Sequence, residues 1–64
     1  MLPVRFTYLD GNEKVYLSIL GQFKHHFTGK TYHKVRLEGE NGWVEEFFYL
    51  EEVVMNLLKK RVEE

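Results

Sequence analysis

The chain has 64 residues, with nine Lys or Arg against ten Asp or Glu, and it contains no cysteine. This length gives room for one small domain, residues 1–64, and chains of this size bury about 60% of the surface that the unfolded chain exposes. The lack of cysteine excludes disulfides and thiolate metal sites, and small domains without them often gain burial by self-association. We therefore expect a homodimer or a complex with another protein.

Hydrophobic residues make up 44% of the chain, which argues against disorder. The longest uninterrupted apolar segment, residues 47–50, is far too short for a signal peptide or a membrane span. We expect a soluble, cytoplasmic protein without membrane contact.

Charge is segregated along the sequence, although the net charge is only −1. Residues 24–36 contain four Lys or Arg, three His and no acid, whereas residues 38–52 contain six Glu and no base. A near-neutral chain is not expected to bind nucleic acid through its overall charge. A local basic surface is compatible with this charge pattern.

Alternating apolar and polar residues predict two antiparallel strands, over about residues 3–9 and 14–26. Between them, Gly11 and Asn12 favour a type II′ hairpin turn. Closing the turn there places six apolar side chains on one face: Val4, Phe6, Tyr8, Val15, Leu17 and Ile19. Gly21, within the second strand, predicts a bulge or a bend.

A second hairpin should lead into a third strand over about residues 30–37. We expect a three-residue loop, residues 27–29, with Gly29 in the left-handed conformation. A two-residue turn would place Lys34 and Arg36 in the core, where unpaired charges are costly. The longer loop predicts a core face of Ile19, Phe23, His25, Thr31, His33, Val35 and Leu37. The outer face would then carry Gln22, Lys24, His26, Lys30, Tyr32, Lys34 and Arg36.

A fourth strand is predicted over about residues 43–49, and it is apolar on both faces. One stripe is Val44, Phe48 and Leu50, and the other is Trp43, Phe47 and Tyr49. Helical spacing then predicts a helix over about residues 50–62, with a cationic last turn that suits the helix dipole. The expected fold class is α+β. We expect a four-stranded antiparallel β-meander that is curled, with a barrel-like sheet as the extreme case, and one C-terminal α-helix packed on the sheet. The sequence leaves open which stripe the helix covers.

Residues for catalysis or cofactor binding are not evident. His25 and His33 share a predicted face, but a third metal ligand is not apparent, so we expect no metal site. Glu45 and Glu46 are adjacent in a strand and point opposite ways, so they cannot act as a paired acid and base. We expect a binding module without cofactor rather than an enzyme.

Two binding surfaces are predicted. The first is a protein–protein interface through Trp43, Phe47 and Tyr49, which would form a homodimer or bind another protein. The alternative is single-stranded nucleic acid or another polyanion on the outer face of the second and third strands, where cations and rings alternate. The residues of this anion-binding face are Lys24, His26, Lys30, Tyr32, Lys34 and Arg36.

Overall fold

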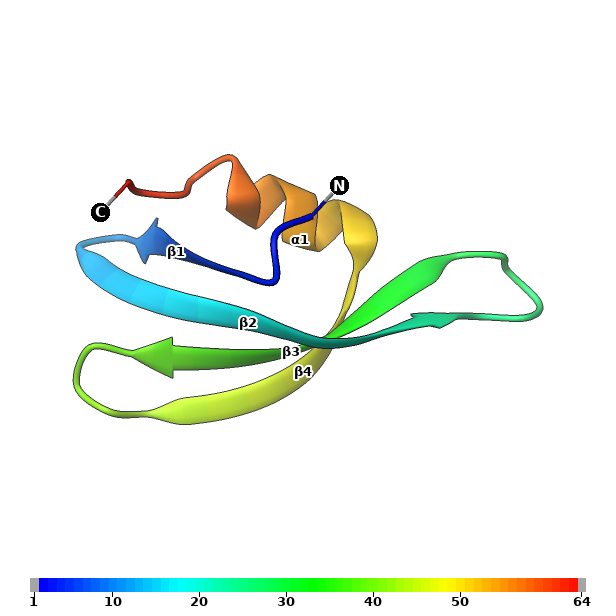
Figure 1. The fold of residues 1–64 in the computed structure, drawn as a ribbon, viewed down its shortest axis with the longest axis horizontal. Helices are drawn as coiled ribbons and strands as arrows, with labels where there is room; N and C mark the ends of the chain where they lie inside the picture. Colours follow the sequence, from blue (N-terminus) through cyan, green and yellow to red (C-terminus); the bar gives the residue numbers. More distant parts are fainter. Residues whose placement is uncertain (1, 64) are drawn as a thin grey trace.

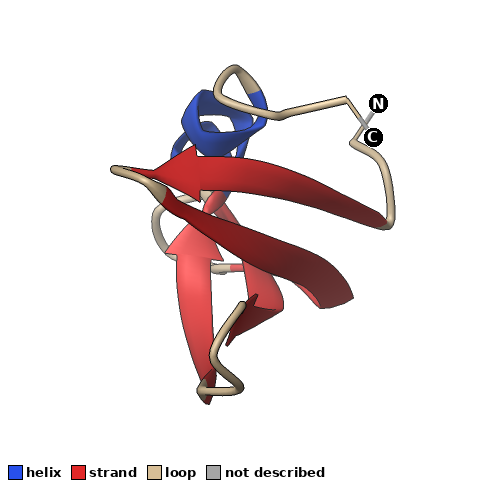
Figure 2. Ribbon diagram, turned by 90° about the vertical axis from the view of Figure 1, so that its left-hand side faces the viewer, coloured by secondary structure: helices blue, strands red, loops and turns tan. Residues whose placement is uncertain are grey.

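A computed structural model, which describes residues 2–63, contains one sheet and one helix (Figure 1). The strands are β1 (Arg5–Asp10), β2 (Glu13–Lys24), β3 (Thr31–Gly39) and β4 (Val44–Leu50), and the helix is α1 (Glu51–Leu58). The strands pair antiparallel in the order β1-β2-β3-β4, and α1 lies on one face of the sheet. The predicted meander with a C-terminal helix is therefore confirmed. The sheet is strongly twisted but not closed, because β1 and β4 remain its two edges (Figure 2).

The first hairpin has the predicted register. Tyr8 is opposite Val15, and Phe6 is opposite Leu17. Gly11 has a φ of 64°, a positive value that glycine adopts without steric cost at the start of such a turn.

The core lies between α1 and the face of the sheet beneath it. Its most buried side chain from α1 is Val54, with no exposed surface, which contributes about 1.5–3 kcal/mol relative to leaving it in water. The buried hydrophobic residues are Tyr8, Val15, Leu17, Val35, Leu37 and Val54. Five of these six come from β1, β2 and β3, so β4 adds comparatively little to the closed core.

A bulge at Leu20 reverses the side-chain alternation along β2. Before it, Ile19 is opposite Val35, whereas after it Gly21 is opposite Lys34. The extra residue therefore turns every later side chain of β2 to the other face of the sheet. Gly21 had predicted an irregularity here, but not its effect on the alternation.

The bulge makes the predicted direction of Phe23 wrong. Phe23 is opposite Tyr32 on the outer face and is 51% exposed, whereas Gln22 is opposite the buried His33. The prediction assumed an unbroken ladder from Ile19 onward, and one inserted residue removes that continuity.

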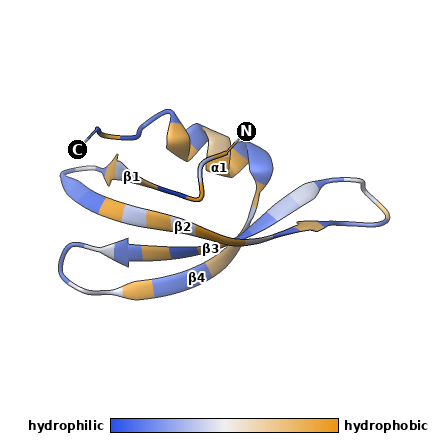
Figure 3. Cartoon of the chain, viewed as in Figure 1, coloured by the Kyte–Doolittle hydropathy of each residue, from blue (hydrophilic) through white to orange (hydrophobic). Residues whose placement is uncertain are grey.

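Beyond the bulge, the β2–β3 hairpin extends past the rest of the molecule (Figure 1); we call residues 22–32 the arm. Its hydropathy is mostly hydrophilic to neutral (Figure 3). The His25 N–H donates to the Lys30 carbonyl at 2.9 Å, so four residues rather than three form the loop. Gly29 has the predicted left-handed conformation, with a φ of 70°. His25 is exposed in this turn rather than in the core, which corrects that prediction as well.

The helix is shorter than the predicted range of 50–62, because the end of the chain turns away to cover β1. Arg61 forms a bridge with Tyr8, and the Val62 N–H donates to the Thr7 carbonyl at 2.9 Å. These contacts protect part of an otherwise open strand edge. Because α1 ends at Leu58, the cationic residues that follow are not part of it, and the predicted cationic last turn does not form.

Candidate binding surfaces

β4 forms an edge of the sheet, since β3 pairs with it on one side and no strand within residues 2–63 pairs with the other. Phe47 is opposite Val35 and thus lies on the face covered by α1, but 37% of its surface is still exposed. Phe48 is opposite Lys34, on the outer face. The helix therefore covers, incompletely, the stripe that contains Phe47.

The other apolar stripe of β4 faces solvent. Val44 is 54% exposed and Phe48 is 61% exposed. The Phe48 ring meets Phe23 of β2 edge-to-face, with centroids 5.6 Å apart, a favourable aromatic geometry. Because Phe23 was expected in the core, the sequence did not predict this outer aromatic pair.

The three predicted interface residues differ in their exposure and in the contacts that they already make. The Trp43 indole N–H donates to the Glu13 carboxylate at 2.9 Å, and the side chain is half-buried. Tyr49 is also half-buried and stacks on Phe47, with centroids 5.5 Å apart and an interplanar angle of 8°. Burial, followed by the nearby Glu45 carboxylate, raises the pKa of Tyr49 above its ordinary value. Of the three, Phe47 is the most exposed.

On the outer face, two predicted anion-binding residues are already paired. Arg36 donates to one oxygen of Glu46 through Nε at 3.3 Å and Nη2 at 3.1 Å. Lys34 Nζ lies 3.7 Å from the other oxygen of the same carboxylate. One glutamate from β4 thus partly neutralises both cations.

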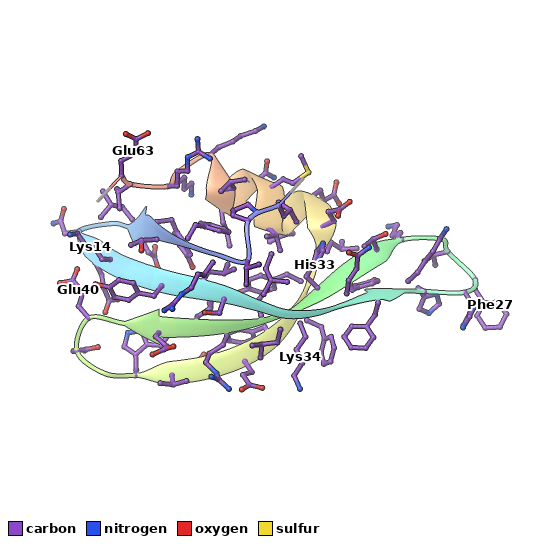
Figure 4. All side chains as sticks on the ribbon, viewed as in Figure 1. Lys14, Phe27, His33, Lys34, Glu40 and Glu63 are labelled. Atoms are coloured by element: carbon purple, nitrogen blue, oxygen red, sulfur yellow. The ribbon has the colours of Figure 1, made fainter. Side chains whose placement is uncertain are left out.

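The remaining predicted anion-binding residues lie on the arm, on both of its faces. Tyr32 lies on the outer face as predicted, whereas the bulge turns Lys24 to the opposite face, which corrects its predicted direction. His26 and Lys30 lie in or beside the turn. The arm contains no Asp or Glu. Phe27 projects from its tip and is 96% exposed (Figure 4).

Hydrogen bonds within the turn hold the tip in shape. The Thr28 N–H donates to His25 Nδ1 at 3.3 Å, and the Lys30 N–H donates to the Thr28 hydroxyl at 3.2 Å. The Gly29 N–H donates to the His25 carbonyl at 2.8 Å. Phe27 is therefore presented from an ordered turn.

A cavity of about 400 Å³ lies near the bulge, where β2, the residues before β1 and the start of α1 meet. His33 and Glu51 line it, and His33 Nε2 lies 3.0 Å from Glu51 Oε1. Figure 4 places His33 on the side of β3 that faces α1 and Lys34 on the opposite side. The sequence predicted that His33 faces inward, but it gave no signal of this partner.

The described residues contain no group of three or more His, Cys, Asp or Glu positioned to hold a metal ion. Within residues 2–63, no helix has the length and apolar character required to cross a bilayer. Comparison with known proteins gave no matching family model, no significantly similar curated protein and no significantly similar solved structure.

Proposed function

We propose that this chain is a non-catalytic binding module that associates with a second copy of itself through the free edge of β4. The observation that carries the proposal is the exposure of apolar side chains on both faces of this edge strand: Val44, Phe47 and Phe48. An edge strand offers unpaired backbone N–H and C=O groups to another strand. Its last four residues carry no charge that would oppose such pairing.

Antiparallel pairing about a two-fold axis limits the possible registers. With Phe47 opposite the partner subunit's Phe47, Glu46 lies opposite the partner subunit's Phe48, and Glu45 lies opposite the partner subunit's Tyr49. No carboxylate is then directly opposite another, whereas a register centred on Glu46 would oppose two like charges. In this register, each β4 residue lies opposite a partner residue whose side chain points to the same face of the sheet. The helices of the two subunits therefore lie on one side of a continuous sheet.

A pair of substitutions at Phe48 tests both the association and this register. Phe48→Glu places a carboxylate opposite the partner subunit's Glu46, twice by symmetry, but opposite Lys34 within its own chain. Phe48→Lys instead places a cation opposite the same glutamate. Sedimentation velocity should give twice the chain mass for the unsubstituted protein, a monomer for Phe48→Glu, and tighter association for Phe48→Lys than for Phe48→Glu.

Phe27→Glu is the matched control, because it changes an exposed phenylalanine far from β4 along the sheet. It should leave the mass unchanged. A monomer at millimolar concentration of the unsubstituted chain would refute self-association through β4. Equal association of the two Phe48 variants would refute the register.

A second candidate function, binding of single-stranded nucleic acid by the arm, is favoured by Phe27. A ring that is 96% exposed on a protruding turn, beside Lys24 and Lys30 and without a nearby acid on the arm, suits base stacking combined with phosphate contacts. The partial neutralisation of Lys34 and Arg36 by Glu46 moves the expected contact from the sheet face to the arm.

Fluorescence anisotropy with an oligothymidine strand tests this candidate. Phe27→Ala should weaken binding by about 1–3 kcal/mol, whereas Phe27→Trp should retain it. The double change Lys24→Gln and Lys30→Gln should reduce the slope of log K against log salt by about 1.4, since each phosphate contact on a single strand contributes about 0.7. Binding that is absent at low salt, or unaffected by Phe27→Ala, would exclude the arm as the site.

A further inference from the structure

The cavity beside the bulge has the size and composition of a small-molecule site. Its volume of about 400 Å³ falls within the range of about 300–1,000 Å³ that is typical of ligand pockets. One wall is apolar and includes Val4, Ile19 and Leu20, while Gln22, His33 and Glu51 form the polar part. Apolar walls with a few convergent polar groups are the usual composition of such sites.

One ring nitrogen of His33 is paired and the other is not. The Glu51 carboxylate can only accept, so Nε2 carries a hydrogen and donates to it. Nδ1 is buried without a hydrogen-bond partner among the described residues, and it can accept a hydrogen bond when the ring is neutral. His33 itself is only 4% exposed. Buried polar atoms without a partner are uncommon in folded proteins, so this nitrogen requires an explanation.

Glu51 makes the cavity selective for positive charge. Its side chain is 46% exposed, and its partner among residues 2–63 is His33, which donates one hydrogen bond to it. No Lys or Arg of the described chain lines the cavity. The carboxylate therefore offers several free acceptor positions to a cationic ligand and repels an anionic one.

We infer that this cavity binds a small organic cation, a primary ammonium with a second hydrogen-bond donor and a compact apolar body. The ammonium donates to Glu51, the second donor pairs with Nδ1 of His33, and the apolar body packs on Val4, Ile19 and Leu20. Because Nδ1 exposes almost no surface, the imidazole must shift slightly to accept this bond. The site is separate from the β4 edge and meets the arm only at Gln22, its first residue, so its occupation does not depend on either proposed function.

Phenylalaninol serves as the probe, because it combines an ammonium, a hydroxyl and one aromatic ring. We expect a Kd of about 1 mM, as befits a ligand of this size, with amide shifts in ¹H–¹⁵N spectra at Ile19, Leu20 and Gln22. The ¹⁵N shift of His33 Nδ1 should move toward the value of a hydrogen-bonded acceptor, which a merely apolar ligand would not cause. The matched compounds 3-phenylpropan-1-ol and 3-phenylpropanoate lack the cation and should bind at least about tenfold more weakly.

Two variants separate ligand recognition from folding. Glu51→Gln removes the charge and should weaken phenylalaninol binding by about tenfold or more, whereas Glu52→Gln, on the neighbouring exposed side chain, should not. Leu20→Ala shortens the apolar wall at a residue that is already 44% exposed and should weaken binding about three- to tenfold. Unchanged affinity in Glu51→Gln, equal binding of 3-phenylpropanoate, or no amide shifts at these positions would overturn the inference and leave a solvent-filled cavity.

Discussion

The indole of Trp43 lies directly against Gly39, so that a Cβ atom at Gly39 would overlap the ring. Gly39 is the last residue of β3 and is opposite Val15, and its N–H donates to the Trp43 carbonyl at 2.9 Å. Since the indole N–H also donates to Glu13, Trp43 connects the β3–β4 turn to the start of β2. Glycine is needed here for space rather than for an unusual φ, because Gly39 is not among the glycines with positive φ.

The first prediction is that Gly39→Ala destabilises the fold by about 2–4 kcal/mol, because the indole must leave its place. Urea unfolding should show this loss, and the folded variant should have red-shifted Trp43 fluorescence. Gly11→Ala is the control, since a Cβ there meets nothing within 4 Å and the loss comes from the positive φ alone, about 1–2 kcal/mol. Equal losses in the two variants would contradict the steric role of Gly39.

The second prediction concerns the dependence of stability on pH. Burial, with smaller contributions from Tyr49 and Asp10, raises the pKa of Tyr8 from its ordinary 10.0 to about 12. The unfolded chain therefore loses this proton at lower pH than the folded chain does. The contribution of Tyr8 is fully present below pH 10 and is lost as the pH rises through about 12.

Thermal unfolding at a series of alkaline pH values measures this effect, and Tyr8→Phe isolates it. The variant lacks the titrating group, so its unfolding temperature should decline less steeply between pH 10 and 12. Parallel decline of both proteins would assign the effect to other groups.

The third prediction tests the closure of the β1 edge by the end of the chain. Val62→Pro removes the N–H that donates to Thr7 and should cost about 1 kcal/mol or more of unfolding free energy. Val62→Ala removes most of the side chain but keeps the donor. If the hydrogen bond matters, the proline variant should be the less stable of the two in urea unfolding.

The fourth prediction concerns the carboxylate between the outer-face cations. Glu46→Gln frees Lys34 and Arg36, whose side chains are 41% and 44% exposed, so the stability should change by less than about 1 kcal/mol. If single strands bind this side of the molecule, affinity for oligothymidine and its salt dependence should both rise. Glu45→Gln, on the opposite face of β4, should leave both unchanged.

The sequence predicted the parts of the fold in which a local signal agrees with the packing. Gly11 and the alternation around it determined the register of Tyr8 with Val15, because turn and pattern impose the same pairing. The helical spacing from Leu50 likewise predicted a helix where α1 forms. Such agreement between turn chemistry and apolar period is the condition under which local prediction succeeds.

The sequence-based predictions are wrong where one inserted residue or one distant contact overrides the periodicity of the apolar residues. Leu20 adds a residue to β2 without any change in polarity that would reveal it, and Phe23 consequently faces outward. The chain leaves the helical conformation because Val62 bonds to Thr7, a contact of long sequence separation. The pairing of His33 with Glu51 has the same origin, since it joins β3 to a helix whose placement the sequence does not specify.

The bulge in β2 also divides the protein into two parts that need not open together. Residues 22–32 contain no buried side chain, whereas Leu17 and Val35, on the other side of Leu20, have no exposed surface. Backbone amides of the arm are therefore free to exchange with deuterium through small local fluctuations, while those flanking Leu17 exchange through cooperative unfolding. The arm can therefore change in length or composition over evolution with little effect on the folding stability of the rest of the domain.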